Sequence, residues 1–155
     1  MANSKFSGDV KRTYAAGEVI VREGDMDGEM YIVQQGRVSV RKRVGEDELE
    51  LAILKKGEIF GEMALLEGEP RTSTVYAIEP TNVLVIKSGG FLMRIRRDPT
   101  FAFELMQQLS GRVRHLNEQL AYVTATAEAM GIHIPVVADI KAGNSTKVKA
   151  SGRAK

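Results

Sequence analysis

A short segment at residues 60–75 carries a glycine, a carboxylate and an arginine in an order suited to binding a sugar phosphate. Gly61 lets the backbone approach a ligand closely, and the apolar residues 63–66 begin a short helix whose free amide N–H groups favour a negative charge. Arg71 supplies a planar fork of donors that matches phosphate oxygens. Glu62 would repel a bound phosphate, so its position predicts that it accepts a hydrogen bond from a hydroxyl group of the same ligand.

Ribose provides such a hydroxyl group. A 3′,5′-cyclic phosphate is singly charged and leaves the ribose 2′-OH free, so Arg71 and Glu62 together would read the two groups that define a cyclic nucleotide. The alternative is an ordinary surface ion pair between these two side chains, worth about 0 to 1 kcal/mol. A solvated pair would not need the glycine and the helix start beside it, so the segment favours the binding site.

This segment resembles the phosphate-binding cassette of the cyclic nucleotide-binding domain family, F-G-E-x-A-L-(spacer)-P-R-(T/S/A)-x-T-V, and the resemblance extends from about Tyr14 to about Tyr122. A motif of this length with fixed end points is more specific than a lone glycine pattern. The resemblance implies that the ligand is cyclic AMP or cyclic GMP and that no further cofactor is needed. It also implies the cassette contacts, which are Gly61, Glu62, Met63, Ala64, Arg71 and Thr72.

The resemblance also implies where the purine base lies. Val40 and Leu51 should offer it apolar contact, although both fit an ordinary core equally well. Leu116 and Asn117 fall where the long helix reaches the base in the catabolite activator protein, a member of the family, and a solvent-facing asparagine is the alternative. The hydroxyl of Thr72 is compatible with either base. Cyclic AMP is favoured because Asn117 can accept a hydrogen bond from the adenine amino group.

Short apolar runs divided by glycines from Gly17 to Ile86 are typical of an all-β domain. Strands are expected near residues 19–22, 30–35, 38–44, 49–54, 74–78 and 82–86. Leu49, Leu51 and Ile53 alternate with other residue types, as in a strand with one buried face. The resemblance implies a mainly β fold, a jelly-roll β-barrel followed by two helices.

Helical periodicity begins after these strands. A first helix is expected from Ser88 to Arg96, and a longer one from Pro99 to about Ala125, with Asp98 as its cap. Its apolar residues recur every three or four positions: Phe101, Leu105, Leu109, Val113, Leu116, Leu120 and Val123. The first three should pack on the barrel, and the last four fit a two-heptad seam for a homodimer. A monomer whose helix folds back along its own barrel is the alternative.

The expected organisation is an N-terminal arm at 1–13, the cyclic nucleotide-binding domain at 14–125 and a C-terminal extension at 126–155. Within the domain the barrel covers 14–87 and the helices 88–125. The extension is basic, and from residue 138 its composition is typical of a disordered tail. It is too short and too poor in apolar periodicity for the helix-turn-helix of the catabolite activator protein, so DNA is not an expected partner. Of the arm, only residues 4–11 could be helical.

Composition excludes several other classes of function. The 155 residues suit one domain, and a net charge of +2 is too small to indicate a nucleic-acid-binding protein. The absence of cysteine rules out thiol catalysis and agrees with a reducing cytoplasm. No apolar run approaches the about 20 residues of a membrane span, and the N-terminus lacks a signal peptide. The expectation is a soluble, cytoplasmic protein without a membrane partner.

Neither catalytic nor metal-binding residues are expected. His115 and His133 are far apart in sequence and have no metal-ligand spacing. Residues 25–28 look like part of a calcium loop, but Gly36 stands where a bidentate glutamate is needed, so a turn is expected there. Hydrolysis of a cyclic phosphate needs a metal or a general base, whereas Glu62 is committed to a hydroxyl group.

The sequence therefore predicts a stand-alone, bacterial-like module that senses a cyclic nucleotide and signals to an unknown protein effector through its C-terminal helices. Two alternatives stay open: part of a DNA-binding transcription regulator, and a regulatory piece of a channel or kinase. An enzyme built on the same barrel is the least favoured.

Overall fold

Short strands dominate the N-terminal part of the chain, and helices follow them. The computed structural model describes residues 9–133. In chain order the elements are β1 (Val10–Tyr14), β2 (Val19–Val21), β3 (Glu29–Gln35), β4 (Val38–Val44), β5 (Asp47–Leu54), β6 (Ile59–Phe60), α1 (Glu62–Glu67), β7 (Thr74–Ala77), β8 (Thr81–Lys87), α2 (Ser88–Arg97) and α3 (Pro99–Ala129). The chain divides into two compact units, 1–112 and 113–155, so the division falls inside α3.

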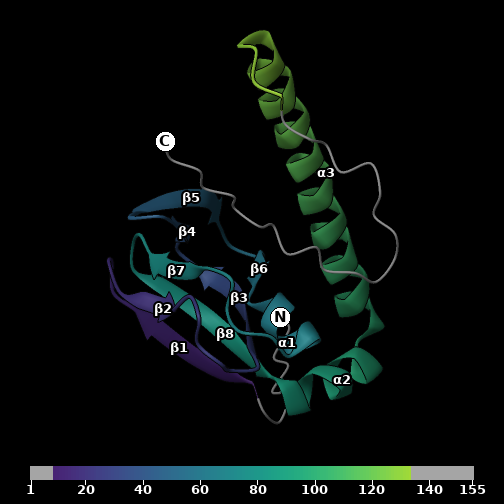
Figure 1. Ribbon diagram of the computed structural model, residues 1–155. Helices are drawn as coiled ribbons and strands as arrows, with labels where there is room; N and C mark the ends of the chain where they lie inside the picture. The colour runs from purple at the N-terminus through teal and green to yellow at the C-terminus, as the bar shows by residue number, and fades with distance from the viewer. Residues whose placement is uncertain (1–8, 134–155) are drawn as a thin grey trace. The chain divides into compact units, whose positions relative to one another are not determined.

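The strands of the first unit form two four-stranded antiparallel sheets, in the orders β1-β8-β3-β6 and β2-β7-β4-β5 (Figure 1). A cluster of buried apolar residues joins strands of both sheets: Val21, Tyr31, Val33, Val38, Leu54, Phe60, Val75, Val83 and Val85. The core therefore lies between the sheets. The prediction of a mainly β fold followed by two helices is confirmed, but the described strands form a sandwich of the jelly-roll kind and not a closed barrel.

A second apolar cluster covers the other face of the first sheet. It contains Met30, Ile32, Ile59, Ile86, Phe91, Phe101 and Leu105. Successive residues of a strand point to opposite faces, so β3 and β8 are buried on both sides. The ring centroids of Phe91 on α2 and Phe101 on α3 are 6.1 Å apart in an edge-to-face arrangement. The prediction that the first part of the long helix packs on the β domain is confirmed.

The expectation that Leu49, Leu51 and Ile53 share one buried face is wrong. All three side chains are exposed. The register between β4 and β5 shifts at a bulge, so Leu49 lies opposite Lys42, Ile53 lies opposite Ser39, and Leu51 has no directly paired residue. An extra residue at a bulge moves the following side chains to the other face of the strand. A bulge has no clear signal in an alternating sequence.

Several boundaries differ from the expected ones. Strand β1 begins at Val10, so residues 10 and 11 are extended and not helical, and the two-residue strand β6 was not expected. Both C-terminal helices occur where they were expected, and α3 continues to Ala129. The basic tail from residue 138 lies outside the described residues. The division into arm, domain and extension stays a prediction.

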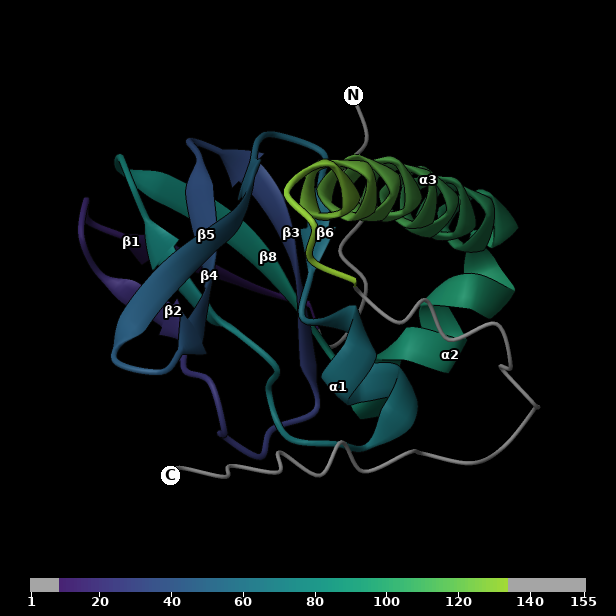
Figure 2. The same ribbon diagram turned by 45° about the horizontal axis from the view of Figure 1, so that its top comes forward.

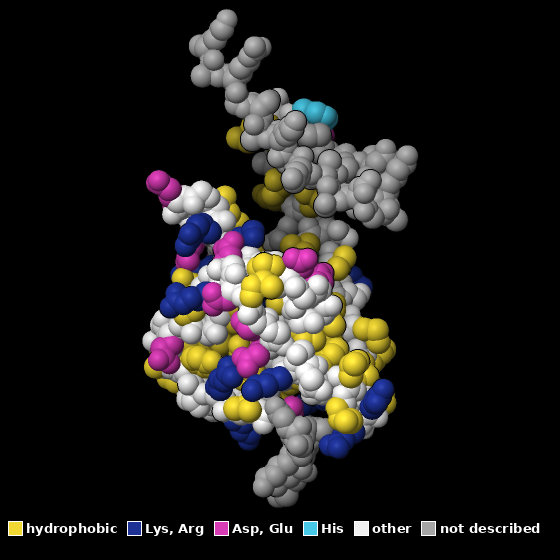
Figure 3. Space-filling model, turned by 60° about the horizontal axis from the view of Figure 1, so that its bottom comes forward, with side chains coloured by type: hydrophobic (Ala, Val, Ile, Leu, Met, Phe, Trp, Pro, Cys, Tyr) yellow, Lys and Arg dark blue, Asp and Glu magenta, His cyan; other side chains and the backbone are white. Residues whose placement is uncertain are grey.

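Charges of both signs are distributed over the surface. Figure 3 shows Lys and Arg side chains interspersed with Asp, Glu and hydrophobic side chains on the face that it presents. This face has no extended field of one sign, in keeping with the net charge of +2. Within residues 9–133, the helices include none with the length and apolar content needed to cross a membrane.

We predict that Gly36→Ala lowers the free energy of unfolding by about 2 kcal/mol or more. Gly36 has φ 83°, and an added Cβ would lie 2.4 Å from the Pro80 carbonyl oxygen and 2.9 Å from the Thr81 Cα. Gly17→Ala is the matched control, because φ is 88° and nothing lies within 4 Å of the added Cβ. Its free energy of unfolding should fall by only about 1 kcal/mol, the cost of placing alanine in the left-handed backbone conformation. Urea unfolding measures both, and equal losses would show that the clash contributes nothing.

Candidate functional site

The predicted helix start of the cassette is present. Gly61 precedes α1 with φ 77°, in the left-handed region, and no side-chain hydrogen bond caps this helix N-terminus. An added Cβ would lie 2.6 Å from Arg71 Nη1 and 3.1 Å from the Glu29 carbonyl oxygen. Glycine is therefore required twice, by its backbone conformation and by close packing. On α1, Ala64 is buried and Met63 is exposed.

The side chain of Arg71 is buried and fixed by hydrogen bonds. The residue is only 4% exposed. Its Nε donates to Asp27 Oδ2 at 3.1 Å, its Nη1 to the Gly61 carbonyl at 2.9 Å, and its Nη2 to the Glu29 carbonyl at 2.6 Å. Nη2 also donates to Asp27 Oδ1. These bonds use four of the five guanidinium N–H groups, which leaves one Nη1 donor for a ligand and holds the group in a fixed orientation.

Asp27 is a site residue that the sequence reasoning missed. Residues 25–28 were expected to form a turn, and they do connect β2 to β3. Within this connection Asp27 supplies the counter-charge of Arg71. A buried guanidinium without such a partner would be strongly unfavourable, so this ion pair stabilises the buried side chain of Arg71. The sequence indicated only a turn-forming acid, because the partner lies 44 positions away.

A second layer of polar groups supports the arginine. The guanidinium carbon of Arg71 lies 5.6 Å from the ring centroid of Tyr31, whose hydroxyl donates to Glu29 Oε2 at 3.0 Å. Arg12 on β1 pairs with the same carboxylate at 2.7 Å. The hydrogen bond from Arg12 lowers the pKa of Glu29, whereas burial and the nearby Glu29 raise the pKa of Tyr31. Glu29 is therefore ionised at neutral pH and Tyr31 keeps its proton.

Glu62 is buried against the long helix. It is 5% exposed, and Arg112 Nη1 on α3 donates to its Oε1 at 2.9 Å. Arg112 Nη2 also donates to the Ile59 carbonyl. One turn earlier on α3, Gln108 Oε1 accepts from the Ile59 amide at 3.0 Å and its Nε2 donates to the Gly57 carbonyl at 2.9 Å. Two polar side chains of α3 therefore hold β6 and the start of the cassette.

Neither Gln108 nor Arg112 was predicted, although the sequence holds a signal for both. They continue the three- and four-residue spacing of Phe101 and Leu105. The buried face of α3 thus turns from apolar to polar where it meets β6 and Glu62. Two polar residues that continue an apolar stripe at helical spacing therefore indicate that the helix face also makes polar contacts with the domain.

The residues expected around the base are spread over several elements. Val40 on β4 is half-buried and packs against the core, whereas Leu51 on β5 is exposed. Thr72 is exposed, and its carbonyl accepts a hydrogen bond from Lys42 Nζ at 2.8 Å. Leu116 is exposed on the surface of α3.

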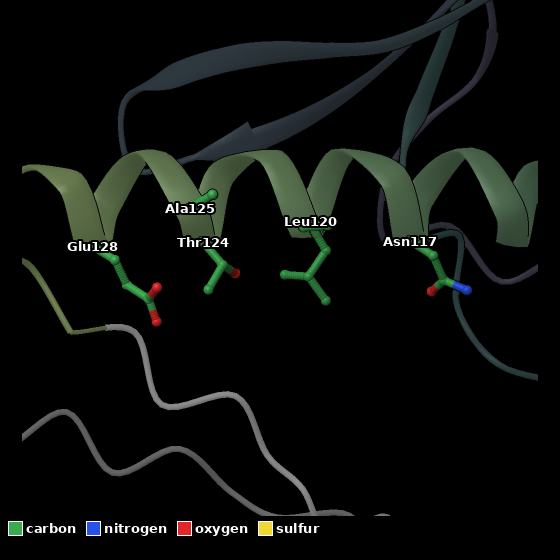
Figure 4. A pocket seen from close by; sticks show the side chains of 6 residues that line it. Asn117, Leu120, Thr124, Ala125 and Glu128 are labelled. Atoms are coloured by element: carbon green, nitrogen blue, oxygen red, sulfur yellow. The ribbon is translucent and has the colours of Figure 1, made fainter.

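Asn117 lies in the second unit, on an exposed part of α3. Figure 4 shows Asn117, Leu120, Thr124 and Glu128 projecting from the same side of the helix, where they line a pocket. No cassette residue lines this pocket. The contact of Asn117 with a base, like that of Leu116, stays a prediction.

The described strands form a two-sheet sandwich, and Gly61 at the start of α1 accepts a hydrogen bond from the buried Arg71. This arrangement is that of β domains with a cassette of the kind described above. Figures 1 and 2 show this short helix, α1, beside α2 at one end of the sheets. The family model described as the cyclic nucleotide-binding domain matches residues 11–98, and the chain belongs to this family.

A bacterial receptor protein and a kinase regulatory subunit have similar sequences. The cyclic AMP receptor protein of Thermus thermophilus is 36% identical over 111 residues, which cover 71% of this chain and 51% of the relative. The type II regulatory subunit of the cAMP-dependent protein kinase of Drosophila melanogaster is 43% identical over 68 residues, 44% of this chain and 18% of the relative. The crystal structure of the Thermus thermophilus catabolite activator protein matches with a TM-score of 0.67 and 34% identity, over 74% of this chain and 55% of that chain. The chain thus spans about half the length of the bacterial relative and less than a fifth of the kinase subunit.

We predict that Arg112→Met lowers the free energy of unfolding by about 1 to 3 kcal/mol, because Glu62 would be left buried without its charged partner. Arg37→Met is the matched control: it removes an exposed ion pair with Glu79, with side chains 54% and 38% exposed, and should cost at most about 1 kcal/mol. Urea unfolding compares the two variants. A loss at Arg112 no larger than at Arg37 would show that Glu62 is solvated without its partner.

Proposed function

We propose that the chain is a regulatory module that binds a 3′,5′-cyclic purine nucleotide without transforming it. The observation that carries this proposal is the buried, pre-oriented guanidinium of Arg71 beside Gly61 and the uncapped start of α1. A cyclic phosphate fits this place because the free Nη1 donor and the first amide N–H groups of α1 can donate hydrogen bonds to its oxygens. Glu62 lies directly after Gly61 and accepts from the ribose 2′-OH.

The remaining contacts follow from the family. The proposed ligand-binding residues are Gly61, Glu62, Met63, Ala64, Arg71, Thr72, Val40, Leu51, Leu116 and Asn117. Cyclic AMP is the favoured ligand and cyclic GMP the second, because the amide oxygen of Asn117 can accept from the adenine amino group. The names of the Thermus thermophilus receptor protein and the Drosophila melanogaster regulatory subunit refer to cyclic AMP, whereas a similar kinase of Eimeria tenella is named for cyclic GMP.

The ion pair between Glu62 and Arg112 supports signalling through the C-terminal helix. A ligand hydroxyl that donates to Glu62 would share the carboxylate with Arg112, which donates to its Oε1. Ligand binding therefore changes the interaction that holds α3 to the cassette, and the difference in affinity between the two arrangements sets the size of the response. Arg112 is the last residue of the first unit, so the second unit, 113–155, begins directly beyond this contact.

The setting in which the module acts is also part of the proposal. We place it in the cytoplasm, as a 14–125 domain with an arm and an extension, acting on a protein effector. Because the chain spans about half of the cyclic AMP receptor protein, the DNA-binding function of such regulators is not carried over. A role as part of a transcription regulator would show as salt-dependent DNA affinity. A role as the regulatory piece of a channel or kinase would show as a fused domain in the gene.

Isothermal titration calorimetry with cyclic AMP and cyclic GMP tests the binding proposal. We expect Arg71→Ala to lose about 2 to 4 kcal/mol of binding free energy, because the phosphate would lose its charged partner in a buried site. Glu62→Gln should lose less, since an amide oxygen still accepts from the 2′-OH, and a 2′-deoxy ligand should bind the wild type poorly. Arg37→Ala is the exposed control. Unchanged affinity in Arg71→Ala would remove this residue from the site, and equal affinity for deoxy and ribo ligands would remove the ribose contact.

We expect α3 to form the seam of a homodimer. The apolar residues Val113, Leu116, Leu120 and Val123 are each more than half exposed on it. Burying this stripe against a twin helix would remove it from water. Leu120→Glu places a charge in the proposed seam and should give monomers that still bind nucleotide. Sedimentation of both proteins at micromolar concentration with ligand is the measurement, and a monomeric wild type would contradict the dimer while leaving the binding proposal intact.

A further inference from the structure

Lys42 on β4 reaches the edge of the cassette from a strand that the cassette motif does not include. Its Nζ donates to the Thr72 carbonyl at 2.8 Å, one residue beyond Arg71. The Glu23 carboxylate lies 3.5 Å from the same nitrogen and also accepts from the Arg43 amide at 3.0 Å. The ammonium group is therefore held at a defined place beside the cassette. An ammonium has three N–H donors, so one remains for a ligand.

Apart from these two acceptors, the strand neighbours of Lys42 on its own face are apolar. It lies opposite Leu49, and residues two apart on a strand share a face, so Val40 and Val44 flank it on that face. Val40 packs against the core between the sheets, whereas Val44 and Leu49 are exposed. An exposed apolar surface with a single cation suits a flat, mostly apolar ligand group with one polar edge. A purine base has this character.

The same contacts disfavour a phosphate at Lys42. A phosphate oxygen at this nitrogen would also approach the carboxylate of Glu23 and the carbonyl of Thr72, and both would repel it. A neutral acceptor atom experiences much less repulsion. Arg71, by contrast, is buried and has unused donor capacity beside the helix start. The two cations therefore differ in role, with Arg71 suited to the anion and Lys42 to an uncharged acceptor.

We propose that Lys42 selects for guanine over adenine by donating to the O6 and N7 edge of the base. Guanine presents acceptors at both atoms, whereas adenine presents the N6 amino donor in place of O6. The proposal rests on the cyclic nucleotide binding proposed above and deepens it. Lys42 would thus oppose the preference for cyclic AMP that Asn117 provides, and the ratio of the two affinities would depend on both side chains.

The test is calorimetric titration of wild type and Lys42→Met with cyclic AMP, cyclic GMP and cyclic IMP. Methionine keeps the length and the apolar stem of the side chain but removes the donor. Cyclic IMP carries O6 and N7 but lacks the guanine 2-amino group. We expect Lys42→Met to weaken cyclic GMP and cyclic IMP by about tenfold each, the size of one charged hydrogen bond, and to change cyclic AMP by less than about twofold. Lys11→Met, an exposed lysine on β1, is the control and should change none of the three.

Each other outcome rejects the assignment in a different way. Equal losses for all three ligands would place Lys42 on the phosphate or the ribose, with the cassette intact. A loss for cyclic GMP alone would exclude a contact with O6 and N7, because cyclic IMP carries the same two atoms, and no loss for any ligand would remove Lys42 from the site. A wild type that binds none of the ligands would overturn the proposed function itself. Lys42→Arg keeps a donor, and thermal unfolding of all variants shows whether a loss of binding reflects a loss of folding.

Discussion

The burial of the Arg71 guanidinium is the constraint on which the site depends. A charged group removed from water needs hydrogen-bonding partners, and here they come from separate parts of the chain: Asp27 before β3, the Glu29 carbonyl on β3 and the Gly61 carbonyl before α1. Gly61 can accept this neighbour only because it has no Cβ. The arginine therefore fixes the relative positions of the β2–β3 connection, the first sheet and α1.

The charges of Arg71 and Glu62 are each neutralised by another side chain. Arg71 pairs with Asp27, and Glu62 pairs with Arg112. A cyclic nucleotide would approach both pairs at once, with its phosphate at one and its 2′-OH at the other. In the proposed function the phosphate would use the remaining Nη1 donor of Arg71 and the 2′-OH would donate to Glu62, so the ligand would add to the two ion pairs. In the proposed function a ligand at Glu62 would act on α3 through Arg112, because Arg112 belongs to that helix.

The first sheet is buried on both faces, and α2 and the start of α3 cover the face that points away from the second sheet. Met30 and Ile32 face the helices while Tyr31 and Val33 face the second sheet. Without α2 and the start of α3, one face of β3 and β8 would be exposed to water. Phe101 and Leu105 supply this cover, and Gln108 and Arg112 continue the same helix face toward the cassette. The packing on the first sheet and the hydrogen bonds to β6 and Glu62 thus come from one helix.

The sequence by itself determined the local features. The spacing of glycine and apolar residues predicted most strands and both C-terminal helices, and the cassette motif predicted Gly61 and the helix start, because these depend on residues close together in the chain. The tertiary structure decided the partners of those residues. Asp27 is 44 positions from Arg71, and Arg112 is 50 positions from Glu62, so no local pattern links them. It also decided the bulge that places Leu49 and Ile53 on different faces, since a register shift arises from pairing between strands and not from the alternation within one.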